Sequence, residues 1–285
     1  MMINRRAFLL TASAFAATPV FAKETPPALL TYERDCGGRI GLYARNVTSG
    51  AELAWRDQER FVMCSTFKAS LAACVLARVD RGQDRLEAMI PYTQKDLLDY
   101  APVAKDNLAR GALSVGEMAK AIVELSDNTC ANLLLARIGG PKALTRFWRD
   151  HGDVTSRLDH NEPELNRTPP GKLEDTTTPR AMALSLEHLA LGDGLQPGSR
   201  AQLVEWMVNC KTGANRLRAG LPPSWKIGDK TGNNGKDAAG DIAVAWPAPD
   251  RPVIIAAYTR GGKPTPEQLN TVFKAIGELV GERLA

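Results

Sequence analysis

Apolar residues recur at strand-like spacing near both ends of the chain. Short stretches that alternate or run apolar and are bounded by turn residues are typical of β-strands. Two such stretches lie near the start, joined by a turn at residues 48–50, and three lie near the end. The predicted strands are 39–47, 52–55, 226–230, 241–246 and 253–259. Residues 267–283 follow them with the spacing of an amphipathic helix.

The middle of the chain has helical spacing instead. Its first predicted helix, residues 66–80, is apolar almost all round, which places it in the centre of a domain rather than on a surface. The further predicted helices are 114–125, 129–138, 141–151, one that starts at 178–179, and 200–210.

Strands at both ends around a helical middle predict an α+β fold. We expect one antiparallel sheet of about five strands, built from both chain ends and flanked by helices, with an inserted all-α domain. The predicted boundaries assign residues 23–56 and 208–285 to the sheet domain and residues 57–207 to the helical domain. A groove between the two layers is the expected place for an active site.

The first 22 residues have the pattern of a signal peptide. Arg5 and Arg6 form a basic start, residues 7–17 are apolar, and residues 20–22 have the small-x-small pattern of a cleavage site. The apolar stretch is short for a membrane span. The paired arginines fit either the general secretory (Sec) or the twin-arginine (Tat) export route. We therefore expect a periplasmic or secreted protein, cleaved after Ala22 and not attached to a membrane.

Charge and composition argue against several classes of partner and cofactor. The net charge of +4 would fall to +2 on cleavage, because 34 basic residues would then face 32 acidic ones. Such a small excess does not favour nucleic acid or an anionic membrane surface. The three histidines and five cysteines lack the spacing of a zinc site, so neither a metal nor another cofactor is expected. An odd cysteine count leaves at least one thiol free or paired with another molecule, and pairing of Cys74 with Cys130 stays open.

Ser65 and Lys68 form an S-x-x-K pair at the start of the apolar helix. Residues three apart lie on one helix face, and the N–H groups at a helix start favour the negative charge of an oxyanion. Serine needs a base to act as a nucleophile, and a lysine can be that base if burial keeps its amine partly neutral. Taken alone, the pair is more simply a capping serine beside a solvent-exposed lysine.

Two further segments carry polar side chains suited to the same chemistry. Ser126 and Asn128 belong to an S-D-N triplet that could be a helix cap or could pass a proton to a leaving nitrogen and bind a substrate amide. Glu162 and Asn166 lie in a long irregular segment, residues 157–178. Segments of that length are usually functional or disordered, and a glutamate beside a water is a general base for hydrolysis of an acyl-enzyme. Taken alone, this glutamate would be a surface carboxylate.

The triplet K-T-G occurs twice. The copy at residues 211–213 follows a predicted helix and fits a basic last turn with a glycine cap. The copy at residues 230–232 ends a predicted strand, where Gly232 permits close backbone approach and Lys230 and Thr231 could hold a carboxylate. We assign the chemistry to the second copy.

The order and company of these motifs resemble class A serine β-lactamases over nearly all of the mature chain, residues 27–283. The segment 157–177 resembles the omega loop of that family. The resemblance implies an exported hydrolase that opens the β-lactam ring of penicillins and cephalosporins and confers resistance. It implies a small-molecule β-lactam as the partner, and we expect a monomer. The implied catalytic residues are Ser65, Lys68, Ser126, Glu162 and Lys230, and the implied substrate-binding residues are Asn128, Asn166, Thr231, Gly232, Asn233, Arg216 and Tyr100.

The resemblance also implies a role for each matching group. Ser65 is acylated, and Lys68 and Glu162 manage its proton. Ser126 protonates the departing ring nitrogen. The N–H groups of Ser65 and Asn233 form the oxyanion hole.

The remaining implied roles concern water and substrate. Glu162 and Asn166 position the water that removes the acyl group. Lys230 and Thr231 meet the substrate carboxylate, aided by Arg216 at a position where some members carry an arginine. The aromatic residue at the cleft entrance is matched by Tyr100.

Two departures from the family pattern have consequences. His160 stands where an arginine commonly pairs with the omega-loop aspartate, here Asp175, and a neutral imidazole would weaken that tie and loosen the loop. Asn233 and Asn234 stand where members often carry smaller residues or a cysteine. Cys64 therefore lacks the disulfide partner that some members have, and carbapenem hydrolysis is not implied. Cys64 itself is expected to be a small buried residue at a tight turn.

Two other functions fit part of the pattern. Penicillin-binding D-alanyl-D-alanine peptidases share the first, second and fourth motifs but lack the segment that carries Glu162 and Asn166. A β-lactam sensor that acylates without turnover would need a membrane tether or an output domain, and neither is visible in the sequence. Rapid removal of the acyl group separates a β-lactamase from both.

Overall fold

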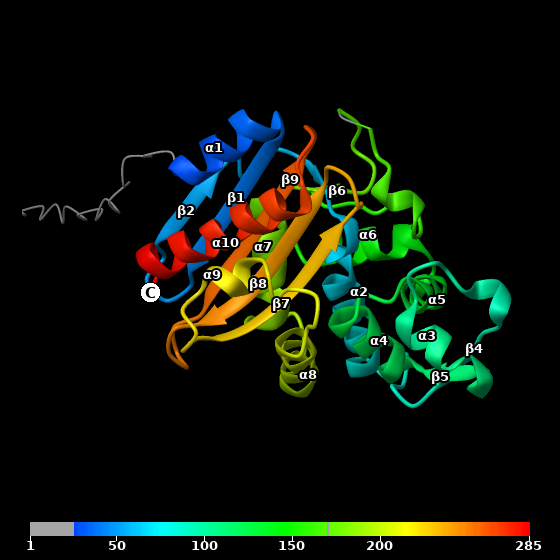
Figure 1. The fold of residues 1–285 in the computed structure, drawn as a ribbon. Coiled ribbons are helices and arrows are strands. Elements are labelled where there is room, and N and C mark those ends of the chain that lie inside the picture. The colour runs from blue at the N-terminus through cyan, green and yellow to red at the C-terminus, as the bar shows by residue number, and fades with distance from the viewer. Residues whose placement is uncertain (1–25, 170) are drawn as a thin grey trace, which may run out of the picture.

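The central sheet is built from both ends of the chain, as predicted. A computed structural model describes residues 26–169 and 171–285 (Figure 1); the predicted signal peptide lies outside this part. Five antiparallel strands have the order β2-β1-β9-β8-β7. Their bounds are β1 Arg39–Asn46, β2 Glu52–Trp55, β7 Lys226–Asn233, β8 Ala239–Trp246 and β9 Val253–Arg260. β1 pairs with β9 along its whole length, from Arg39↔Arg260 to Asn46↔Val253.

Alternation along the strands divides the core into two parts. In β9, Ile254 and Tyr258 belong to the core on the helical side, whereas Val253 and Ile255 belong to the core on the other side. Successive side chains of a strand point to opposite faces, so a strand that is apolar throughout must be covered on both. The sheet is therefore the middle layer of three.

One face of the sheet is covered by helices from the two chain ends. These are α1 (Pro27–Cys36), α10 (Pro266–Arg283) and the short α9 (Leu217–Gly220), which lie together in front of the strands in Figure 1. α1 was not predicted from the sequence. It begins with Pro27 in its first turn and ends at Gly37, whose φ of 69° is the left-handed conformation that glycine adopts without strain.

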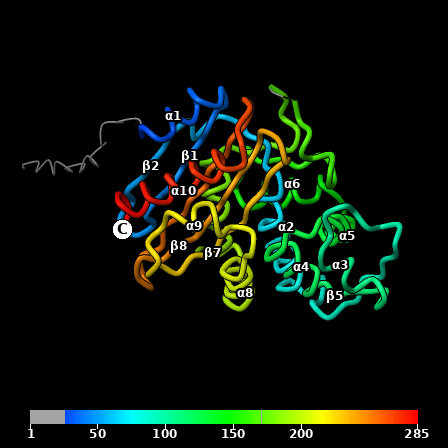
Figure 2. Tube along the Cα trace, viewed as in Figure 1, coloured from blue at the N-terminus to red at the C-terminus, as the bar shows by residue number. Residues whose placement is uncertain are grey.

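The other face carries the helical region, with α2 (Phe67–Asp80) at its centre. α2 packs against helices on several sides, which is the reason for its nearly all-round apolar sequence. Its surrounding helices are α4 Val115–Glu124, α5 Asn128–Ile138, α6 Pro141–Asp150, α7 Pro179–Ala190 and α8 Pro197–Val208. α7 also packs on β1 and β9, and Figure 2 shows α4 and α5 beside α2 at the far end of this region.

Short elements complete the helical region. They are α3 Pro102–Asp106, the strand pair β3 Phe61–Val62 and β6 Thr176–Thr177, and the pair β4 Met89–Pro91 and β5 Ala112–Ser114. The predicted division into domains at residues 56–57 and 207–208 stays a prediction. No helix in residues 26–169 and 171–285 is both long and apolar enough to cross a membrane.

Several predicted element boundaries differ from the observed ones by one to three residues. α8 begins at Pro197, three residues earlier than predicted, because proline fits the first helical turn. β7 continues through the whole K-T-G triplet to Asn233, three residues beyond the predicted end at Lys230. Register pairing with β8 extends to Asn233↔Ala239, so Lys230 and Thr231 are held by a strand ladder and not by a loop.

Candidate active site

Ser65 lies in a 3-10 turn, Cys64–Thr66, that leads directly into α2. β7 packs against this turn so closely that a Cβ on Gly232 would lie 2.6 Å from the backbone nitrogen of Ser65. Only glycine permits that approach. Cys64 has a φ of 45°, an uncommon conformation for a residue other than glycine. Strained backbone of this kind persists where the surroundings hold it and is frequent at functional sites.

Three predicted catalytic groups meet at the Ser65 hydroxyl. Lys68 Nζ donates to Ser65 Oγ at 2.9 Å, and Ser65 Oγ donates to Glu162 Oε1 at 3.1 Å. Lys68 Nζ lies 3.1 Å from the same carboxylate oxygen. The serine proton can therefore pass to either an amine or a carboxylate, both within hydrogen-bond reach.

Lys68 is fully buried, and its ammonium is surrounded by acceptors. Besides Ser65 and Glu162, it donates to the Ser126 carbonyl at 2.8 Å and to Asn128 Oδ1. Burial lowers the pKa of Lys68, and the nearby Glu162 carboxylate opposes that shift. A lysine base needs a lowered pKa, while the carboxylate supplies a second acceptor for its proton.

Ser126 links the two buried lysines of the site. Its hydroxyl accepts from Lys230 Nζ at 3.1 Å and from Lys68 Nζ at 3.5 Å. Ser126 precedes α5 and has a φ of 61°, a conformation that is strained outside glycine. Lys230 also donates to the Thr231 carbonyl at 2.6 Å. Burial lowers the pKa of Lys230 to about 8, so its charge can change near neutral pH.

Two asparagines hold Glu162, one at its carboxylate and one at its backbone. Asn166 Nδ2 donates to Glu162 Oε2 at 2.6 Å. Asn132 on α5 both donates to the Glu162 carbonyl and accepts from the Glu162 N–H, each at 2.9 Å. Asn132 was not predicted. The sequence feature that points to Asn132 as a site residue is its position one helical turn after Asn128, on the same face of the helix.

The Asp127 side chain, to which no role was assigned, anchors the S-D-N turn. Its Oδ1 accepts from the Cys130 N–H at 2.8 Å, so it caps α5. Its Oδ2 accepts from the N–H groups of Val103 and Ala104 at 2.9 and 3.0 Å. The carboxylate thus joins α5 to α3 directly behind Ser126.

The predicted substrate-binding residues lie at the rim of this centre. The Tyr100 carbonyl accepts from the Asn128 N–H at 3.0 Å, while the Tyr100 side chain is half exposed. Asn233 is exposed at the end of β7, and Thr231 is buried two residues before it.

Arg216 is tied to the sheet beside the K-T-G strand. Its Nη1 donates to the carbonyls of Gly232 and Gly240 at 2.9 and 2.8 Å, and its guanidinium lies over the Phe273 ring. The side chain is partly exposed. A fixed guanidinium next to β7 is a suitable group for carboxylate binding.

His160 forms the omega-loop tie that the sequence interpretation expected to be weak. His160 Nδ1 lies 2.6 Å from Asp175 Oδ2, and Asp175 Oδ1 accepts from the N–H groups of Asp159 and His160. The hydrogen bond to Asp175 raises the pKa of His160, which favours the charged imidazolium. The assumption of a neutral imidazole therefore holds only at higher pH.

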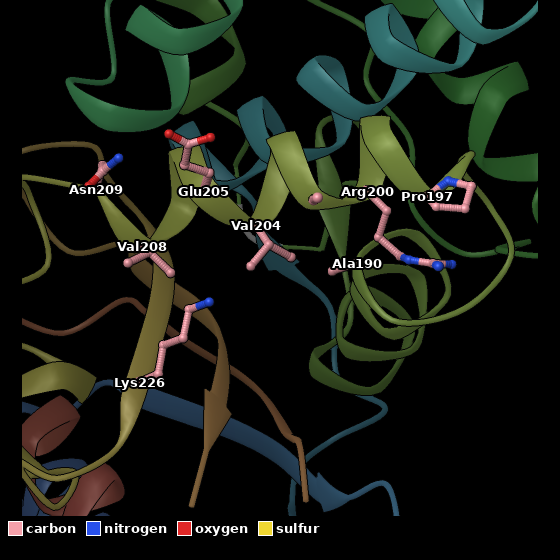
Figure 3. Close-up of a pocket in the computed structure, with 9 residues that line it drawn as sticks. Ala190, Pro197, Arg200, Val204, Glu205, Val208, Asn209 and Lys226 are labelled. Atoms are coloured by element: carbon pink, nitrogen blue, oxygen red, sulfur yellow. The ribbon is translucent and has the colours of Figure 1, made fainter. Parts of the chain in front are cut away.

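The remaining candidates from the sequence are the cysteines and a metal site. All five cysteines fall within the described residues, and each is free and buried. Burial raises the pKa of Cys64, which does not favour a second nucleophile. In residues 26–169 and 171–285, no three His, Cys, Asp or Glu side chains are placed to hold a metal ion. A hollow of about 510 Å³ beside α8, lined by Arg200, Val204 and Lys226 among others (Figure 3), contains none of the predicted catalytic residues.

Comparison with known proteins matches the chain to one family. The family model described as "Beta-lactamase enzyme family" matches residues 27–284. Beta-lactamase L2 from Stenotrophomonas maltophilia is 44% identical over 87% of this chain and 82% of its own length. The carbapenem-hydrolyzing beta-lactamase KPC from Klebsiella oxytoca is 40% identical over 100% of this chain and 98% of its own.

Solved structures give the same result. An ancestral class A beta-lactamase has a TM-score of 0.86 at 49% identity and covers 89% of this chain and 97% of its own. A beta lactamase from Xanthomonas campestris has a TM-score of 0.87 at 46% identity over 90% of this chain and 96% of its own. The predicted resemblance is confirmed. The chain belongs to the beta-lactamase enzyme family, among its class A members.

Proposed function

We propose that this enzyme hydrolyses β-lactams through an acyl-enzyme on Ser65 and thereby confers antibiotic resistance. The observation that carries the proposal is the triangle of Ser65 Oγ, Lys68 Nζ and Glu162 Oε1, with each pair of atoms 2.9–3.1 Å apart. A nucleophile with two adjacent proton acceptors is the arrangement that acyl transfer requires. The omega-loop carboxylate is the group that the peptidase alternative lacks.

Acylation uses the groups around the Ser65 hydroxyl. As the Ser65 oxygen attacks the lactam carbonyl, its single proton passes to one of these groups, either the Lys68 amine in its neutral form or the Glu162 carboxylate. The N–H groups of Ser65 and Asn233 stabilise the oxyanion that forms. The close packing of Gly232 against the Ser65 turn supports this role, because it brings the end of β7 next to Ser65. The C–N bond then breaks, and Ser126 delivers a proton to the ring nitrogen. Lys230, at 3.1 Å from Ser126 Oγ, assists that transfer.

Deacylation uses the omega loop. Glu162 takes a proton from a water that attacks the ester carbonyl of the acyl-enzyme, and the proton returns to Ser65 as the product leaves. Asn166 shares that water, since its Oδ1 is buried and has no hydrogen-bond partner among the described residues. A positioned general base accounts for about 10²–10⁴ of the rate of such a step.

Substrate orientation comes from three sides of the site. The carboxylate common to penicillins and cephalosporins binds to Lys230 and Thr231, with Arg216 beside them. The side-chain amide of the substrate binds to Asn128, and Tyr100 flanks the entrance. We also propose that residues 1–22 direct export and that the mature enzyme acts in the periplasm or after secretion.

The test is turnover of a chromogenic cephalosporin by the purified mature chain. Glu162→Ala is expected to acylate on Ser65 and to lose deacylation by about 10²–10⁴, so that intact-mass spectra show a stable adduct. Glu162→Gln, which keeps the shape of the side chain, is the matched control and should accumulate the same adduct. Unchanged turnover without an adduct would refute the role of Glu162. Cleavage of D-alanyl-D-alanine peptides in place of β-lactams would favour the peptidase.

A further inference from the structure

The first K-T-G copy, Lys211-Thr212-Gly213, is not the end of a helix. α8 ends at Val208 with Asn209 as its cap, so the expected basic last turn with a glycine cap was wrong. The triplet lies in an irregular segment between α8 and α9 that runs beside β7. Its backbone is fixed at both ends of the triplet, by different neighbours.

One anchor is a hydrogen bond, and the other is a close approach. The Lys211 N–H donates to the carbonyl of Glu124, at the end of α4, at 2.9 Å. A Cβ on Gly213 would lie 1.5 Å from Asp229 Oδ2, so the segment reaches β7 only because this residue is glycine. Thr212, between the two anchors, is held facing the second K-T-G copy.

The two threonines of the two copies touch. Thr212 Oγ1 and Thr231 Oγ1 are 2.6 Å apart, and Cys210 Sγ lies 3.3 Å from Thr212 Oγ1. A hydroxyl has one proton to donate and two lone pairs. If Thr231 donated to Thr212, it would have no proton for a substrate carboxylate, which can only accept.

We propose that Thr212 is a positioning residue, which donates its proton to Thr231 and so leaves the Thr231 hydroxyl proton free for the carboxylate of the substrate. This inference rests on the proposed function, in which Thr231 binds that carboxylate. Thr212 touches no substrate in this arrangement and acts through Thr231 alone.

Cys210 favours the same direction of hydrogen bonding. Burial raises the pKa of its thiol, so at neutral pH the group stays protonated and can donate to Thr212 Oγ1. Cys210 then donates to Thr212, Thr212 donates to Thr231, and Thr231 donates to the carboxylate of the substrate. Hydrogen bonds in such a row polarise one another and strengthen the last one.

The first experiment compares Thr212→Val with the unmodified enzyme on benzylpenicillin and on its methyl ester. Valine keeps the branched shape of threonine and replaces the hydroxyl with a methyl group. For the free acid, kcat/KM should fall roughly tenfold, the typical result of losing support for a hydrogen bond to a charged group, mainly through KM. For the ester, which has no carboxylate charge to bind, the fall should be less than twofold. An equal fall for both substrates would mean a structural role and would overturn the proposal.

The second experiment is a double-mutant cycle with Thr231→Val. If Thr212 acts through Thr231, Thr212→Val should change nothing further once Thr231 has lost its hydroxyl. Additive losses would overturn the proposal. Thr212→Ser, which keeps the hydroxyl, should restore the activity on the free acid.

Controls distinguish a folding defect, and a failure of the proposed function, from a failure of the role proposed for Thr212. Thr48→Val removes a threonine hydrogen bond to the Asp250 carbonyl at the far end of the sheet and should leave both substrates unaffected. If thermal melting shows that Thr212→Val does not fold, Thr212→Ala takes its place and is compared with Thr212→Ser. Absence of β-lactam turnover in the unmodified enzyme would refute the proposed function, whereas normal turnover with an unaffected Thr212→Val variant would refute only the role of Thr212.

Discussion

Lys68 and Lys230 are both fully buried in one site, yet their surroundings differ in charge. Lys68 Nζ lies 3.1 Å from a carboxylate oxygen of Glu162. Within the described part of the chain, Lys230 Nζ donates only to the neutral oxygens of Ser126 and Thr231. Burial lowers the pKa of each lysine, but only at Lys68 does a carboxylate in direct contact oppose the shift.

The charge of each lysine is therefore controlled by a different part of the fold. At Lys68 the omega loop supplies the counter-charge, so the protonation of the lysine beside the nucleophile depends on how that loop is held. At Lys230 the strand ladder of β7 fixes the position of the amine, and its charge depends on pH and on the arrival of an anionic substrate. In the proposed mechanism, proton transfer and substrate capture therefore rely on two lysines that respond to different signals.

The largest effect is expected from removal of the Lys68 amine. Lys68→Met should slow acylation of Ser65 by about 10²–10⁴, the range for loss of a general base, and should leave the Glu162 carboxylate buried without its cation. Stopped-flow acylation with a chromogenic cephalosporin measures the change. Lys68→Arg is the matched control, because it keeps the charge but cannot deprotonate, and it should also acylate slowly. Acylation of Lys68→Met within tenfold of the unmodified enzyme would contradict a base role.

The second effect concerns the pH dependence that Lys230 introduces. Its pKa of about 8 makes the amine cationic below that pH and neutral above it. For substrates with a carboxylate, kcat/KM should therefore fall as the pH rises through about 8, by close to tenfold per pH unit. Lys230→Arg keeps its charge at all these pH values, and its profile should stay level to higher pH. An identical upper limb in both proteins would assign the titration to another group.

A smaller effect is expected from release of the omega loop. Asn132→Ala removes both hydrogen bonds to the Glu162 backbone, each worth about 1 kcal/mol. Deacylation should slow by roughly tenfold, and acylation should slow less. Pre-steady-state bursts separate the two steps, and thermal melting checks the fold. Equal losses in acylation and deacylation would show that Asn132 does not act through the loop.

The smallest effect is expected at His160, which stabilises the same loop from its surface. The folded-state pKa of His160 is raised by Asp175, so its contribution is fully present below the unfolded value of about 6.5 and is lost as pH rises through the folded pKa. Because the imidazole is half exposed, only a modest change is expected. Hydrogen exchange in residues 157–177, corrected for the intrinsic pH effect, should be several-fold faster at pH 8 than at pH 5.5. His160→Asn should remove the difference.

Local patterns in the sequence predicted most of the fold and several of the side chains that the structure brings together around Ser65. The apolar character of α2 placed it in the centre of the helical region, and the strand patterns at both ends predicted the sheet. The motifs that contain Ser65, Lys68 and Lys230 were recognisable because their spacing is short. The helix α1 was missed, since its apolar residues are few and its packing partner α10 lies more than two hundred residues away in the chain.

What the sequence could not predict depends on contacts between distant segments. Asn132 resembles any polar residue on a helix until the omega loop folds over it. Thr212 looked like part of a helix end, and only the approach of Gly213 to Asp229 shows that it faces Thr231. The hydrogen bond between His160 and Asp175 could not be predicted for the same reason, because the position of Asp175 relative to the imidazole is set by the loop as a whole.

The pairing of β1 with β9 has a consequence for how this molecule is made. β9 occupies the centre of the sheet, yet it is synthesised after the other four strands and the whole helical region. During translation β1 has no inner neighbour until residue 260 has left the ribosome, so the sheet cannot close on a growing chain. A polypeptide that ends before residue 253 should contain the segments of its helical region but expose apolar strand faces. Proteases would be expected to clear such truncated products.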